Sequence, residues 1–81
     1  MREQKSAQEI REEVNRIANT AVASAGKTGV VGVGEAVHLR EPDANGCNWY
    51  LDFLGPRHLG EVGAALRTVK GKWNLPQRQL L

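Results

Sequence analysis

Residues 30–54 read VVGVGEAVHLREPDANGCNWYLDFL, and this stretch decides the fold. Each half alternates apolar residues with polar or small ones, which is the pattern of a β-strand that buries one face. The middle carries four turn-forming residues, Pro42, Asp43, Asn45 and Gly46. The stretch therefore predicts an antiparallel β-hairpin whose loop covers residues 41–45.

The alternation also predicts how the two strands pair, because a shift of one residue turns every side chain to the other face. Val37 opposite Trp49 and Leu39 opposite Cys47 bring the apolar side chains to one face. The other face is nearly flat and carries Gly32, Gly34, Ala36, His38, Arg40, Asn48, Tyr50 and Asp52. We predict that a protein partner contacts this face, since a backbone can approach it closely. The alternative is a solvated face, as one face of an antiparallel sheet often is.

A first helix is predicted over residues 6–25. It begins with the capping box Ser6-Ala7-Gln8-Glu9, in which the Ser6 and Glu9 side chains satisfy free amides at the helix start. An apolar stripe at steps of three and four residues follows. Gly26 suits the left-handed residue that ends a helix.

A second helix is predicted after Gly55-Pro56, because proline suits the first turn of a helix. Its apolar stripe runs from Leu59 to Val69 and extends to Trp73. Gly60 and Gly63 weaken this helix, and close packing against the sheet would explain one of them.

These elements predict an α+β fold of the order αββα, with both helices packed on one face of the hairpin. The chain forms one domain, residues 1–81, with flexible ends at 1–5 and 77–81. Because a two-stranded hairpin is marginal and has two open edges, pairing with a second copy would extend it to a larger sheet. The predicted core consists of Ile10, Val14, Ile17, Val22, Val37, Trp49, Leu51, Phe53, Val62, Leu66 and Val69.

Composition limits the function classes. Cys47 is the only cysteine, which excludes an intramolecular disulfide and predicts a reducing, cytoplasmic location. The polar N-terminus and the lack of a long apolar run predict neither secretion nor membrane insertion. The net charge is only +2, yet residues 55–81 carry five Lys or Arg and a single Glu. The C-terminal third is therefore mildly basic.

The motifs that resemble catalytic or nucleotide-binding sites lack the required context. Gly26-Lys27-Thr28 matches the end of a phosphate-binding loop but follows a helix instead of a strand. His38, Cys47 and Asp52 are the residue types of a catalytic triad, but in the predicted register Cys47 faces the core and the other two do not. The two histidines and one cysteine do not form a standard zinc set. We expect no enzymatic activity, no cofactor and no metal.

The hairpin motif Asn45-Gly46-Cys47-Asn48-Trp49, followed by Tyr50, resembles small uncharacterised bacterial and phage-borne proteins of αββα layout. The resemblance covers mainly the hairpin and the second helix. It implies a bacterial or prophage accessory protein, and it supplies no functional residues because no activity is established for that group.

Two functions remain. The first is a protein-interaction module, most simply a homodimer, that uses the flat face of the hairpin. The alternative is weak nucleic-acid binding through a surface formed by Arg67, Lys70, Lys72 and Trp73, since cations beside an aromatic ring suit single strands. The same residues also fit an ordinary helix end, where cations complement the helix dipole.

Overall fold

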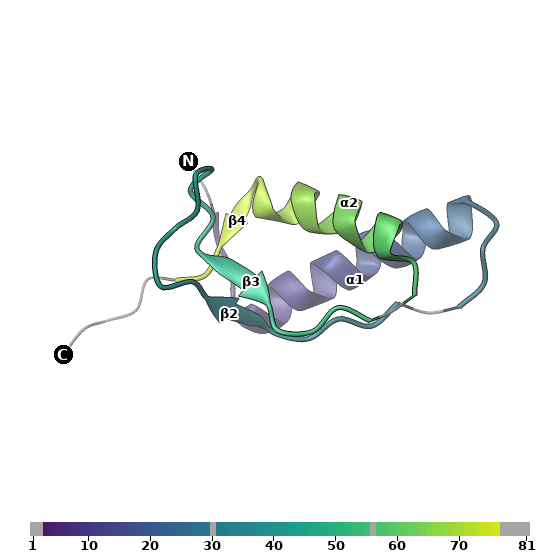
Figure 1. The fold of residues 1–81 in the computed structure, drawn as a ribbon, viewed down its shortest axis with the longest axis horizontal. Coiled ribbons are helices and arrows are strands. Elements are labelled where there is room, and N and C mark those ends of the chain that lie inside the picture. The colour runs from purple at the N-terminus through teal and green to yellow at the C-terminus, as the bar shows by residue number, and fades with distance from the viewer. Residues whose placement is uncertain (1–2, 30, 56, 77–81) are drawn as a thin grey trace.

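The computed structural model describes residues 3–29, 31–55 and 57–76. It contains two helices, a short antiparallel hairpin and a small parallel pair of strands, and Figure 1 shows the helices side by side with the hairpin next to them. The elements run in the order β1 (Glu3–Gln4), α1 (Ala7–Ser24), β2 (Ala36–His38), β3 (Trp49–Leu51), α2 (Leu59–Lys70) and β4 (Trp73–Asn74). The helices contact each other, and β2 contacts α1. The predicted α+β class is confirmed. None of the helices in the described ranges is long and apolar enough to cross a membrane.

The first helix forms as its sequence signals predict. The Glu9 amide donates to Ser6 Oγ and the Ser6 amide donates to Glu9 Oε1, both at 3.1 Å, so the capping box is complete. At the other end Gly26 has a φ of 72°. The Gly26 amide bonds to the Ala23 carbonyl and the Lys27 amide to the Val22 carbonyl, which satisfies carbonyls at the helix end.

The second helix begins at Leu59, after His58 in a left-handed conformation. The expectation for Pro56 falls outside the described residues. A Cβ added at Gly60 or Gly63 would meet no atom within 4 Å, so the expectation that one of them packs closely against the sheet is wrong.

Helix α2 ends at Lys70, and Trp73 lies in a strand instead of the helical stripe expected for it. Strand β4 pairs in parallel with β1, with Glu3 opposite Trp73 and Gln4 opposite Asn74. The Lys5 amide also donates to the Asn74 carbonyl at 2.9 Å. Part of the predicted flexible segment 1–5 therefore pairs with the chain after α2, whereas residues 1–2 and the whole segment 77–81 lie outside the described residues.

The strand pairing differs from the predicted register by one residue. Ala36 pairs with Leu51, Val37 with Tyr50 and His38 with Trp49. Trp49 and Leu51 face the core as predicted, but Ala36 and not Val37 accompanies them there. The strand ladder also ends at Leu51, so the alternation no longer fixes where Phe53 points. The physical reason is the strict alternation of a strand: with Ala36 opposite Leu51, Ala36 shares the buried face and Val37, opposite Tyr50, turns away from it.

The core is built from small residues around one tryptophan. Seven of the predicted core residues are buried: Ile10, Val14, Val22, Trp49, Leu51, Val62 and Val69. Ile17, Val37 and Leu66 are half-buried. Phe53 is 58 % exposed, so its place in the predicted core is wrong. The other buried core residues are Ala18, Val31, Val33, Ala36, Cys47, Ala65 and Leu75.

Candidate interaction surfaces

The one-residue change of register divides the predicted partner surface. Ala36 is buried, and the His38 ring lies 2.8 Å from the Pro76 carbonyl oxygen. The Asn48 side chain forms two hydrogen bonds with the backbone of Leu75. Its Nδ2 donates to the Leu75 carbonyl and its Oδ1 accepts from the Leu75 N–H, each at 2.9 Å. These three residues are parts of the scaffold, so the flat face predicted from the alternation does not exist as one surface.

Glycines 32 and 34 differ as well. A Cβ added at Gly34 would overlap Asp52 and lie 2.9 Å from the Phe53 Cβ, whereas Gly32 has open space around it. The position of Gly34 therefore has no room for a side chain, because the segment Asp52-Phe53 packs directly against it. The members of the predicted surface that are exposed are Gly32, Arg40, Tyr50 and Asp52.

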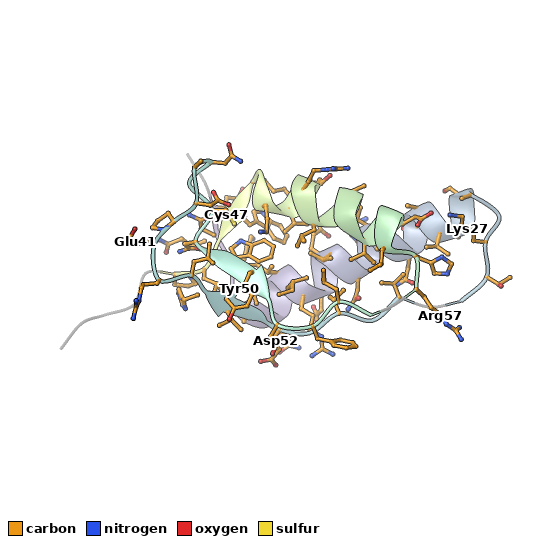
Figure 2. The ribbon with its side chains drawn as sticks, in the orientation of Figure 1. Lys27, Glu41, Cys47, Tyr50, Asp52 and Arg57 are labelled. Atoms are coloured by element: carbon orange, nitrogen blue, oxygen red, sulfur yellow. The ribbon has the colours of Figure 1, made fainter. Side chains whose placement is uncertain are left out.

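A different surface follows from the structure, and we call it the apolar strip. It consists of the four large hydrophobic side chains that are exposed among the described residues: Tyr50 at 43 %, Phe53 at 58 %, Leu54 at 41 % and Leu59 at 56 %. All four lie within ten residues of sequence, from the middle of β3 to the first residue of α2. Figure 2 shows Tyr50, Asp52 and Arg57 following one another along the side of the molecule formed by the hairpin and the segment after it.

The backbone of the apolar strip is tied to the chain before β2. Leu54 forms an antiparallel bridge with Val33, and the Gly34 amide donates to the Phe53 carbonyl at 2.8 Å. At the far end the His58 ring contacts the Thr28 carbonyl oxygen at 3.0 Å, and Lys27 forms an ion pair with Glu61 at 2.6 Å. The strip is therefore a supported part of the fold.

The residues of the predicted nucleic-acid surface mostly contact their own chain. Lys72 Nζ lies 2.7 Å from Glu13 Oε2 and 4.5 Å from the centre of the Trp73 ring. Lys70 Nζ lies 5.7 Å from the Trp49 ring. Trp73 is half-buried against the core, and Arg67 is exposed in the last turn of α2. The pairing of β1 with β4 adds Lys5, whose Nζ lies 5.2 Å from the Trp73 ring.

One carboxylate ties α1 to the chain after α2. Hydrogen bonds from Arg16 and then from Lys72 lower the pKa of Glu13 to about 2. The Arg16 Nε contact is 2.6 Å, and the Glu13 side chain is only 13 % exposed. Similarly, the Lys27 hydrogen bond lowers the pKa of Glu61. Lys72, one of the five basic residues of the C-terminal third, is thus engaged in an ion pair with Glu13.

The residue types of a triad are not assembled. Cys47 is fully buried and its Sγ lies 3.5 Å from the Trp49 carbonyl oxygen. Asp52 is exposed, and Figure 2 shows it well separated from Cys47. Across residues 3–29, 31–55 and 57–76, no three His, Cys, Asp or Glu side chains gather as a metal site would require.

The fold and its surfaces define a small α+β protein with a tryptophan-centred core and one exposed apolar strip. No protein-family model matches this chain, and comparison with curated proteins and with solved structures finds no match either. The similarity of the hairpin motif to small bacterial and phage-borne proteins therefore stays a prediction.

Sequence reasoning found Tyr50 and Asp52 but missed Phe53, Leu54 and Leu59. It assigned Phe53 to the core by extending the alternation of β3 past its end. A signal for the end of the strand was present in Gly55-Pro56, which breaks strands, but no local signal fixes the last paired residue. Lys5 was missed because its position beside Trp73 depends on a pairing between the two ends of the chain.

Proposed function

We propose that this protein is a small, non-enzymatic protein-interaction module that binds its partner through the apolar strip. The supporting observation is the clustering of all the exposed large hydrophobic side chains of the described residues in the segment from Tyr50 to Leu59. Scattered exposed apolar side chains are normal on any protein, but four of them within one ten-residue segment favour an interaction site.

The energetic cost of this exposure favours the proposal. Burying a Leu, Phe or Tyr side chain stabilises a fold by roughly 2 kcal/mol. Because four such side chains are half exposed here, about 4 kcal/mol of stabilising free energy is not gained. That amount is comparable with the whole stability of a small domain. The protein places its single Phe and single Tyr in this strip while both tryptophans pack against or within the core. A partner that covers the strip would recover the lost burial, and aromatic residues are enriched in such interfaces.

The test is site-specific photo-crosslinking in the cells that naturally express the protein. Phe53 is replaced by the photoreactive benzoylphenylalanine, and the matched control carries the same residue at Arg11, an exposed position in α1. We expect one adduct of defined mass from position 53 and none from position 11. Equal adduct patterns at the two positions, or no adduct at either, would contradict the proposal.

A second candidate is weak binding of single-stranded nucleic acid at the basic end of α2. One observation favours it: Lys5 and Lys72 both lie within 6 Å of the half-buried Trp73 ring, so two cations gather beside one aromatic ring. The test is retention of a labelled oligonucleotide at low salt. An Arg67→Ala/Lys70→Ala variant should lose that retention and keep the fold, because the ion pair of Lys72 is left intact.

A further inference from the structure

We propose that the partner of the apolar strip is a second copy of this chain, related by a two-fold axis that sets Asp52 of each copy against Arg57 of the other. This inference rests on the proposed function, because it uses the same strip. It adds the identity of the partner, the symmetry of the complex and the charge pair that aligns it.

Two charges within the strip, on either side of Phe53 and Leu54, carry the inference. Asp52 lies before Phe53 and Leu54, and Arg57 lies after them; both are exposed, as Figure 2 shows. Among the residues that the structure describes, neither takes part in an ion pair within its own chain. An exposed acid and an exposed base therefore flank Phe53 and Leu54, and five residues of chain separate the Cα atoms of the two charged residues by at most about 17 Å.

A two-fold axis makes this arrangement self-complementary. Contacts between identical copies about such an axis use the same patch on both, and when the axis is perpendicular to the strip the patch runs in opposite directions in the two copies. Phe53 and Leu54 then pack against their counterparts, and Asp52 of one copy meets Arg57 of the other at both ends. A parallel arrangement would instead place like charges together, which costs affinity. The sequence of acid, apolar side chains and base thus selects the antiparallel alignment.

The area of the strip predicts a weak dimer. Four side chains with about half of their surface exposed present on the order of 400 Å². Two copies would therefore bury roughly 800 Å² from the strip, which is less than the ~1,200 Å² of a standard stable interface. We expect dimerisation that depends on concentration, with a dissociation constant on the order of 100 µM. A measurement at low micromolar concentration would see only the monomer.

The experiment is sedimentation equilibrium of the full chain from 10 µM to about 1 mM at low salt. Asp52→Arg and Arg57→Asp each turn two attractive pairs into two repulsive ones, so each should weaken the dimer at least ~10-fold. The combined variant Asp52→Arg/Arg57→Asp restores opposite charges and should return to within about threefold of the wild type. The control Glu41→Arg makes the same change of charge at an exposed site away from the strip and should have no effect.

The unmodified protein supplies a second measurement, in case a variant does not fold. Raising the salt concentration from 50 to 500 mM should weaken the wild-type dimer severalfold, because exposed ion pairs are screened. A wild type that stays monomeric at 1 mM would overturn the inference, and so would a double variant that fails to recover. If Phe53→Ser abolishes the dimer while the charge reversals leave it unchanged, the two-fold pairing is wrong and the proposed function stands. If position 53 gives no adduct in cells, the proposed function itself fails.

Discussion

Replacing Gly34 by alanine tests how closely the segment before β2 approaches the segment after β3. The new Cβ would lie 2.9 Å from the Phe53 Cβ and 3.0 Å from the Phe53 backbone nitrogen, and it would overlap Asp52 Oδ1. The exposed Asp52 side chain can rotate away, but the Phe53 backbone is held by its hydrogen bond from the Gly34 amide. The strands must therefore separate. Overpacking of this kind costs about 2 kcal/mol, which lowers the Tm of a domain of this size by roughly 10 °C.

Gly32→Ala is the matched control, two residues earlier in the same segment. A Cβ at Gly32 meets nothing within 4 Å, and neither glycine has the left-handed φ that would strain an alanine. Its Tm should stay within a few degrees of the wild type, or rise slightly because alanine restricts the unfolded chain. The assay is thermal unfolding followed by circular dichroism. Equal Tm values for the two variants would refute the close approach and with it the observed register.

The remaining predictions concern the core, the ion pairs and the thiol. Trp49→Ala should cost about 4 kcal/mol and unfold most of the protein, whereas Phe53→Ala should cost under ~1 kcal/mol in urea titrations, since Trp49 is fully buried and Phe53 is not; similar losses would contradict the assignment of the core. The folded-state pKa of Glu13 is lowered to about 2 from 4.5, so its contribution is present above pH 4.5 and is lost as the pH falls towards 2. Glu13→Gln should therefore lower the free energy of unfolding by about 1 kcal/mol at neutral pH, allowing for solvent screening, and should make stability less sensitive to acid. An unchanged dependence of stability on pH would exclude this role. Cys47 should react with a thiol reagent at least ~100-fold more slowly in native protein than in denaturant, because it is fully buried; fast labelling of the native state would place it at the surface.

Local signals were sufficient for the helices. The capping box at Ser6 and the left-handed Gly26 place the ends of α1 within a residue of the structure. These signals work because the groups that cap a helix lie within four residues of one another in the chain. Apolar stripes at helical spacing likewise identified Ile10, Val14, Val62 and Val69 as core residues.

The candidate site was predicted only in part. Tyr50 in β3 and Asp52 directly after it were assigned correctly to the exposed side, because their alternation with Trp49 and Leu51 is unambiguous. Phe53 was not, since the length of the strand depends on its partner and not on its own sequence. The exposure of this one side chain changes the predicted partner surface from a bare glycine face to an aromatic and apolar strip.

The sequence by itself determined the two helices, the hairpin between them and the α+β class, since each depends on patterns within a few residues. Only the tertiary structure decided the register of the hairpin, because the alternation favours Val37 on the apolar face and the observed pairing instead places Ala36 opposite Leu51 and buries it. It also decided the pairing of β1 with β4, where two-residue strands carry no periodic signal. That pairing exists because the packing of α1 against α2 brings the two ends of the chain together, and its backbone hydrogen bonds need no particular side chains.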